Sequence, residues 1–130
     1  GSLGHGLPIA VGAAMARKIQ NKKGNIFCIV GDGEANEGSI WESLLIAVSN
    51  KLNNLIVIID YNKSQIRSLE PNLNTKMFKS FGCDVALVDG HDVEQLIDSM
   101  SVFDKPKVVL ANTVKGKGIK VRGRVCRVRV

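Results

Sequence analysis

The fold is decided by residues 26–38, which read Ile26-Phe27-Cys28-Ile29-Val30-Gly31-Asp32-Gly33-Glu34-Ala35-Asn36-Glu37-Gly38. The first five residues form an apolar run of strand length, which is typical of a strand buried on both faces of a parallel sheet. A glycine-rich polar loop at residues 31–38 follows, and then a helical pattern of apolar residues between Ile40 and Leu52. A second apolar run at residues 55–59 completes a strand–helix–strand unit.

Elements of the same two kinds continue on both sides of this unit. We expect a helix over residues 7–20, where Pro8 suits the first turn. After an extended polar loop at residues 60–74, the pattern predicts a helix at 75–81, a strand at 85–88, a helix at 93–100 and a strand at 107–114. Strands that alternate with helices predict an α/β fold, a doubly wound parallel sheet with helices on both faces.

Length, composition and charge exclude several classes of protein. The chain has 130 residues, of which 45% are hydrophobic, so it has the size of one domain and is too apolar for a disordered chain. No apolar run approaches the roughly 20 residues that a membrane helix needs. The formal charge of +6 arises from residues 115–130, which hold seven Lys and Arg side chains and no acid. A nucleic-acid-binding face is broader than this and usually carries aromatic side chains, so nucleic-acid binding is not expected.

The cysteines and the first residue bear on compartment and completeness. Cys28, Cys83 and Cys126 are odd in number and show no Cys-x-x-Cys spacing, which favours a reducing, cytoplasmic location. We expect no signal peptide, because the chain opens on glycines and then a helix. Since the first residue is Gly1 rather than methionine, we expect a truncation at the N-terminus, with a processed end or an artificial boundary as the alternatives.

Polar loops follow the two buried strands, and ligands of open α/β sheets bind beyond such carboxyl ends. Asp32 leaves the first strand between Gly31 and Gly33, and the helix that follows presents free N–H groups to an anion. A carboxylate beside an anion requires a bridging cation, and Mg²⁺ prefers oxygen ligands. Asn62 lies beyond the next strand, with 28 residues between it and Gly33, so its amide oxygen returns to the same edge. The sequence therefore predicts a metal and phosphate site.

Other interpretations of this loop fit less well. A Gly-Asp-Gly turn alone is common and carries little information. The dinucleotide fingerprint fails because Asn36 stands where its third glycine belongs, and a calcium loop fails because Glu37 occupies the position of the glycine turn. The pairing of Asp32 with Asn62, each directly after a buried strand, is far more specific.

The chain resembles the thiamine-diphosphate enzymes, and in particular the transketolase family. The stretches that carry the resemblance are residues 1–7, 31–42, 52–55, 60–62, 88–92 and 113–118. The sequences of these stretches are most similar to those of the split bacterial form, in which two polypeptides hold the cofactor between them. The resemblance implies a thiamine-diphosphate-binding domain over residues 1–118, followed by an atypical basic Arg/Val tail at residues 119–130.

The resemblance also implies a role for individual positions. Asp32, the Asn62 side chain and the Ser64 backbone carbonyl are expected to bind Mg²⁺, or Ca²⁺ or Mn²⁺ in its place. Glu37 is expected to act in catalysis as the carboxylate that crosses the dimer interface and couples two active sites. Contacts with thiamine diphosphate are implied for Gly1, Ser2, Leu3, Gly33, Glu34, Asn62 and Ile66.

Three further side chains have competing interpretations. His5 is either a proton-transfer residue or an exposed loop histidine, and the second interpretation is favoured. His91 with Asp92 is interpreted as a turn and helix cap. Trp41 is expected to lie in the core or at an interface.

The activity implied by the resemblance is transfer of a two-carbon ketol unit between sugar phosphates. From the resemblance we expect the pyrimidine-binding domain to be carried by another polypeptide, and we therefore expect activity only with a C-terminal transketolase subunit, in a homodimer or heterotetramer. Two alternatives stay open: another thiamine-diphosphate enzyme, of the 2-oxoacid dehydrogenase or decarboxylase type, or an inactive truncated fragment. Magnesium-dependent binding of the cofactor would separate the fragment from the enzymes.

Overall fold

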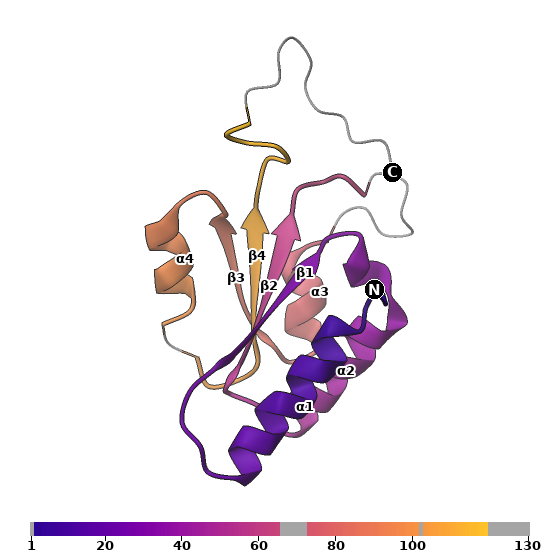
Figure 1. Cartoon of the computed structure of the whole chain (residues 1–130), viewed down its shortest axis with the longest axis vertical. Coiled ribbons are helices and arrows are strands. Elements are labelled where there is room, and N and C mark those ends of the chain that lie inside the picture. The colour runs from indigo at the N-terminus through magenta and orange to yellow at the C-terminus, as the bar shows by residue number, and fades with distance from the viewer. Residues whose placement is uncertain (1, 66–72, 102, 120–130) are drawn as a thin grey trace.

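A computed structural model describes residues 2–65, 73–101 and 103–119 of the chain (Figure 1). Helices and strands alternate along it, as the sequence predicts. The elements are α1 (Gly6–Ile19), β1 (Ile26–Gly31), a 3-10 turn η1 (Glu34–Asn36), α2 (Gly38–Ser49), β2 (Leu55–Tyr61), α3 (Thr75–Ser80), β3 (Asp84–Asp89), α4 (Val93–Ser99) and β4 (Lys107–Asn112). No helix in the described ranges is both long and apolar enough to span a membrane.

In the described residues the strands form a four-stranded sheet in the order β1-β2-β4-β3, and every pair is parallel. The register places Gly31 opposite Asp60, and Asp60 opposite Ala111. All four strands therefore end at one edge, from which the polar loops emerge (Figure 1). This is the edge at which such sheets bind ligands.

Helices cover both faces of the sheet, which confirms the doubly wound α/β fold. α1, α2 and α3 lie on one face, and α4 packs against β3 on the other (Figure 1). The first face holds the main core, which is filled by Leu7, Val11, Val30, Ile40, Leu44, Ile59, Phe78 and Leu110. Ile56 and Val109, which alternate with core residues along β2 and β4, are fully buried on the opposite face.

An aromatic cluster joins α2 to α3. The ring of Trp41 stacks on Phe78 with 5.1 Å between the ring centroids, and Phe81 lies 4.9 Å from the same ring at a tilted angle. Phe78 is completely buried. Trp41 is partly buried and packs against the core, which agrees with the expectation that it lies in the core or at an interface.

The expectation that the first strand is buried on both faces is wrong. Phe27 is 56% exposed and Ile29 is 73% exposed, whereas Cys28 and Val30 on the other face are buried. The physical reason is position: β1 lies at the edge of the sheet opposite to β3, so α4 does not reach it. An apolar run shows that burial is favourable, but it does not show which neighbour provides it.

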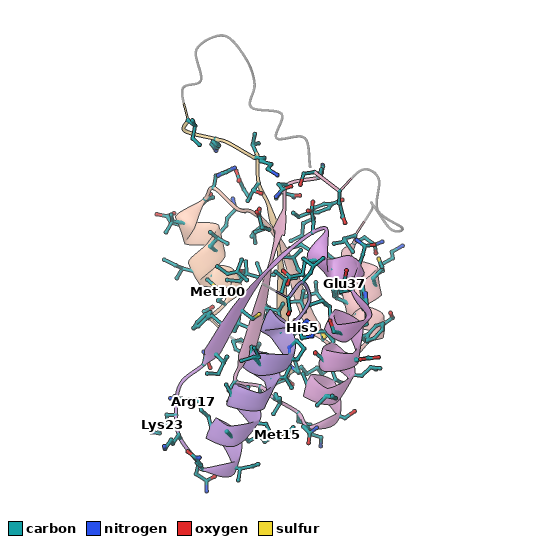
Figure 2. The ribbon with its side chains drawn as sticks, turned by 45° about the vertical axis from the view of Figure 1, so that its right-hand side comes forward. His5, Met15, Arg17, Lys23, Glu37 and Met100 are labelled. Carbon is teal, nitrogen blue, oxygen red and sulfur yellow. The ribbon has the colours of Figure 1, made fainter. Side chains whose placement is uncertain are left out.

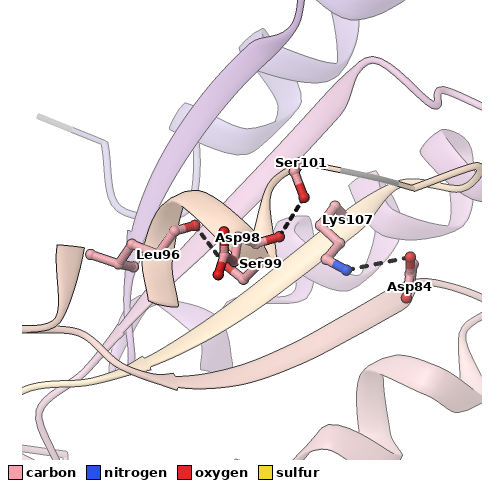
Figure 3. A network of polar contacts seen from close by, with 6 residues as sticks. All are labelled: Asp84, Leu96, Asp98, Ser99, Ser101 and Lys107. Carbon is pink, nitrogen blue, oxygen red and sulfur yellow. Dashed lines mark hydrogen bonds and ion pairs between the residues drawn. The ribbon is translucent and has the colours of Figure 1, made fainter. Parts of the chain in front are cut away.

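An ion pair fastens β3 to β4 at the opposite end of the sheet from the polar loops. Nζ of Lys107 lies 3.4 Å from a carboxylate oxygen of Asp84 (Figure 3). Nearby, Ser99 donates to the carbonyl of Leu96 and Ser101 to that of Asp98, which satisfies carbonyl groups at the end of α4.

Most element boundaries agree with the sequence prediction to within two residues. The main difference lies in the first polar loop, which contains η1 rather than irregular chain throughout. α2 also begins at Gly38 and ends at Ser49, earlier than the apolar pattern between Ile40 and Leu52 indicates. Leu52 nevertheless belongs to the core, because the turn after α2 folds it back inside.

Candidate functional site

Asp32 occupies the position directly after β1, and its side chain is buried. The residue is only 3% exposed, and Oδ1 accepts a hydrogen bond of 2.8 Å from the backbone N–H of Gly33. Oδ2 is buried and has no hydrogen-bond partner among the described residues. A buried carboxylate oxygen without a partner is costly, so this oxygen is available for a cation.

Asn62 lies at the equivalent place after β2, and its amide has a defined orientation. Nδ2 donates across 3.0 Å to Oδ2 of Asp60, while Oδ1 accepts from the backbone N–H of Ser64, also at 3.0 Å. The backbone N–H of Asp32 donates to the carbonyl of Asp60 across 3.2 Å. Asp60 therefore contacts Asp32 and Asn62, two of the three residues that the sequence assigns to the metal.

A second contact joins the loop after β1 to the loop after β2. Nδ2 of Asn36, in η1, donates across 2.7 Å to Oε1 of Gln65. A Cβ placed on Gly33 would lie 3.8 Å from the Cβ of Gln65, so the loop after β2 passes directly over this glycine. The structure thus brings Gly33, Asp32 and Asn62 to the same part of the sheet edge.

The N-terminal loop is attached to the same place through Gly4. The backbone N–H of Gly4 donates to Oε1 of Glu34, and the hydroxyl of Ser39 donates to the Gly4 carbonyl across 2.8 Å. The other carboxylate oxygen of Glu34 accepts from the N–H of Gly31 across 3.3 Å. Ser2 and Leu3, which the sequence assigns to the cofactor, therefore precede a residue held against the Gly31–Gly33 turn.

His5 and Glu37 lie at the starts of α1 and α2, near this attachment (Figure 2). Nδ1 of His5 donates to the carbonyl of Leu3 across 2.9 Å, and the ring is exposed. This contact agrees with the interpretation of His5 as a loop histidine. Glu37 is half-buried, and its Cβ would lie 2.8 Å from a side chain at Gly4.

The loop after β4 forms the third side of the site. His91 Nε2 accepts a hydrogen bond of 2.8 Å from the backbone N–H of Val114. Asp92 caps α4 by accepting from the N–H of Gln95, which confirms the helix-cap interpretation; this hydrogen bond lowers the pKa of its carboxyl. A pocket of about 560 Å³ opens beside Asn62, and its lining includes both basic and amide side chains.

The residues present fit a hard divalent cation. The described residues contain no group of three or more His, Cys, Asp and Glu side chains that could hold a metal ion. The donor set expected here is instead one carboxylate, one amide oxygen and one backbone carbonyl, and oxygen donors of these kinds suit Mg²⁺. The unpartnered Oδ2 of Asp32 is the observation that supports this fit. Gly1 and Ile66 lie outside the described residues.

Comparison with known proteins places this fold among the thiamine-diphosphate-binding domains. Residues 1–127 match the family model described as the transketolase, thiamine diphosphate binding domain. The chain belongs to the transketolase family. The match extends into the basic segment that begins at residue 119.

Similar proteins include single subunits of split transketolases. The apulose-4-phosphate transketolase subunit from Actinobacillus succinogenes is 42% identical, and the alignment covers 95% of this chain and 48% of that protein. The 6-deoxy-6-sulfo-D-fructose transketolase subunit SqwG of Clostridium sp. is 37% identical, with 91% and 46% covered. The chain spans about half the length of these two relatives. The resemblance to the split bacterial form is therefore confirmed.

A solved structure supports the fold. The crystal structure of transketolase from Campylobacter jejuni superposes with a TM-score of 0.78 at 36% sequence identity, over 91% of this chain and 21% of that one. The parallel sheet with helices on both faces is thus the arrangement found in an experimentally determined transketolase.

Sequence reasoning missed the residues that hold the site together. Asp60, Thr113 and His91 make side-chain contacts between the loops, and Glu34 contributes its carboxylate rather than only its main chain. A signal was present for Asp60, because an acid that ends a buried strand two positions before Asn62 shares its side of the strand. The sequence pattern gave no signal for the contact between Thr113 and Asp60, because the two residues are 53 positions apart.

Proposed function

We propose that this chain is the diphosphate- and Mg²⁺-binding half of a transketolase-like enzyme that transfers a two-carbon ketol unit between sugar phosphates. The observation that carries the proposal is the buried, unpartnered Oδ2 of Asp32 at the strand edge where Asn62 also lies. Family membership supports a cofactor that carries a diphosphate. A cation held by Asp32 would offset the repulsion between that carboxylate and the diphosphate.

The residues around this edge would divide the binding of metal and cofactor between them. Asp32, Asn62 and the Ser64 carbonyl would hold the metal, and the backbone of Gly33 and Glu34 would face the diphosphate. In the structure the N–H of Gly33 donates to Oδ1 of Asp32. Thiamine diphosphate, when bound, supplies the carbanion chemistry by which the carbon–carbon bond is cleaved and formed. The protein contributes binding, orientation and exclusion of water around that chemistry.

Glu37 is the side chain that we assign to catalysis. It directly precedes α2, where it is half-buried and its backbone is extended. We propose that its carboxylate meets the matching carboxylate of a second half-site at the interface of two protomers. The relatives support the proposal that activity requires a partner chain. They are named as subunits of transketolases and are about twice as long as this chain.

A binding experiment tests the proposal. Thiamine diphosphate is titrated calorimetrically into the chain mixed with a transketolase C-terminal subunit, with and without Mg²⁺. We expect saturable binding that requires Mg²⁺, is lost in Asp32→Ala and is retained in Asp104→Ala, because Asp104 is an exposed carboxylate outside the site. No binding by the wild-type chain, with its circular dichroism spectrum intact, would identify an inactive fragment and overturn the proposal.

A substrate assay then separates the two kinds of enzyme. The loaded pair is supplied with a ketose phosphate donor and an aldose phosphate acceptor, or with a 2-oxoacid. Ketol transfer without 2-oxoacid decarboxylation is expected. The reverse result would assign the chain to another thiamine-diphosphate activity.

A further inference from the structure

We propose that Asp60 is a positioning residue, whose carboxylate determines which end of the Asn62 amide faces the metal site. The inference rests on the proposed function, because it concerns the metal site assigned there. Asp60 itself would not ligate the metal.

The argument starts from the chemistry of an asparagine side chain. An amide carries a carbonyl oxygen, which can ligate a cation, and an NH₂ group, which cannot. The two groups exchange places when the amide rotates by half a turn, so a metal ligand of this type requires a neighbour that distinguishes them. An ionised carboxylate only accepts hydrogen bonds, and it therefore binds the NH₂ end.

Asp60 provides this discrimination. Its Oδ2 accepts from Nδ2 of Asn62 across 3.0 Å, which directs Oδ1 of Asn62 to the opposite side. There Oδ1 accepts from the backbone N–H of Ser64, the residue whose carbonyl is the third expected ligand. The oxygen of the amide thus faces the loop after β2 and not the strand.

Three hydrogen bonds hold Asp60 and the adjacent Tyr61 in place. The hydroxyl of Thr113, directly after β4, donates to Oδ1, so both carboxylate oxygens have partners. The main-chain carbonyl of Asp60 accepts from the N–H of Asp32, and the Thr113 N–H donates to the carbonyl of Tyr61 across 3.2 Å. Asp60 is also half-buried. A side chain held in this way can transmit a fixed orientation to Asn62.

Two variants separate orientation from charge. In Asp60→Asn the side chain loses its charge. The hydroxyl of Thr113 can accept from the new NH₂ group, which leaves the remaining oxygen to accept from Nδ2 of Asn62, so the orientation is kept without the charge. In Asp60→Ala both the charge and the acceptor are lost. If Asp60 acts by orientation, only Asp60→Ala damages the site. If it acts through its charge alone, the two variants are equally impaired.

The full chain is mixed with the C-terminal subunit, and its affinity for Mn²⁺ is measured from the electron paramagnetic resonance signal of the ion that remains free. Residues that orient metal ligands contribute about 10- to 100-fold to affinity, so we expect Asp60→Ala to weaken Mn²⁺ binding at least tenfold and Asp60→Asn to stay within about threefold. Equal losses in the two variants, or no loss in Asp60→Ala, would overturn the inference. Failure of the wild-type protein to bind Mn²⁺ would instead contradict the proposed metal site.

A second readout requires no metal. The side-chain NH₂ resonances of Asn62, identified by their loss in Asn62→Asp, report the hydrogen bond to Asp60 in the metal-free protein. We expect these resonances to shift and exchange faster in Asp60→Ala, and to be restored toward their wild-type values in Asp60→Asn. Unchanged resonances in Asp60→Ala would overturn the inference, whatever the result of the Mn²⁺ affinity measurement.

Thr113→Val keeps the test valid if Asp60→Ala does not fold. This variant removes only the hydroxyl that holds Oδ1 of Asp60 and leaves the bond to Asn62 possible. We expect a loss of about threefold in Mn²⁺ affinity and a smaller shift of the Asn62 resonances. Wild-type values for both would contradict the role assigned to the Asp60 carboxylate.

Discussion

The backbone N–H of Gly4 donates a hydrogen bond of 2.9 Å to Oε1 of Glu34, 30 positions further along the chain. Since the other oxygen of Glu34 accepts from the N–H of Gly31, a single carboxylate joins the N-terminal loop to the turn that contains Asp32. The two segments implied in cofactor binding therefore have a common anchor.

Replacement of Glu34 by Ala is expected to release both loops. A hydrogen bond to a charged group contributes about 1.5–3 kcal/mol, so amide exchange at Gly4 and Gly31 should accelerate about 10- to 100-fold. Hydrogen exchange followed by nuclear magnetic resonance measures both positions directly. Glu42→Ala, which removes an exposed carboxylate from α2, is the control and should leave both rates unchanged. Unaltered protection in Glu34→Ala would show that other contacts hold the loops.

A methyl group added at Gly4 is expected to lower the stability of the chain more than one added at any helical glycine. Gly4 has a φ of +77°, which costs an L-residue about 1–2 kcal/mol, and an added Cβ would lie 2.5 Å from Oγ of Ser39 and 2.8 Å from Cβ of Glu37. Gly4→Ala should therefore lower the free energy of unfolding by more than about 2 kcal/mol.

Gly12→Ala is the matched control for this prediction. Gly12 lies in α1 with nothing within 4 Å of an added Cβ, so the same substitution should stabilise the chain by about 0.5–1 kcal/mol. Urea unfolding of the two variants measures both values. The prediction fails if the two substitutions change stability in the same direction.

The order of helices and strands was predictable from the apolar residues. They form short continuous runs in the buried strands and recur at helical spacing in the helices. Residues 26–30 and 55–59 fall within β1 and β2, and Asp92 caps α4 as expected. The exposure of Phe27 and Ile29 was not predictable, because burial of an edge strand depends on which element covers it. Hydrophobic periodicity describes one segment at a time and contains no information on the position of a strand in the sheet.

For the candidate site, the sequence predicted where the metal ligands lie but not the hydrogen bonds that hold them in place. Asp32 and Asn62 follow consecutive parallel strands, so their proximity depends only on the topology of the sheet. The contact of Asp60 with Thr113 depends on β4 lying next to β2, an order set by the tertiary fold. Contacts of this kind become visible only when the strand order is known.

The ion pair between Lys107 and Asp84 should respond unequally to removal of either partner. The Lys107 side chain is 9% exposed, whereas that of Asp84 is 37% exposed. Asp84→Asn leaves an ammonium group in a buried position without its counter-ion, and we expect a loss of about 2 kcal/mol or more. Lys107→Met leaves a carboxylate that water can reach, and the loss should stay within about 1 kcal/mol.

Urea unfolding at neutral pH measures both changes, and the double variant tests their coupling. Because the pair is removed as a unit there, Asp84→Asn combined with Lys107→Met should be more stable than Asp84→Asn alone. A larger loss for Lys107→Met than for Asp84→Asn would contradict the assignment of the buried charge.

Burial of Cys83 should make stability depend on alkaline pH. Desolvation raises the pKa of its thiol from 9.0 to about 11. A group whose pKa is raised by folding contributes stability below its unfolded pKa and loses it as the pH rises through the folded value. The contribution of Cys83 should therefore be complete below pH 9 and should decline by about 2–3 kcal/mol toward pH 11.

Comparison with Cys83→Ala isolates this contribution, because the lysines, Tyr61 and the other cysteines are present in both proteins and cancel. The free energy of unfolding in urea is measured for each protein at intervals between pH 8 and pH 11. The difference between wild type and variant should be constant up to about pH 9 and then move in favour of the variant, since only the wild type gains a thiolate on unfolding. A difference that stays constant up to pH 11 would show that the thiol ionises as readily in the folded chain as in the unfolded one, and that Cys83 is not buried in solution.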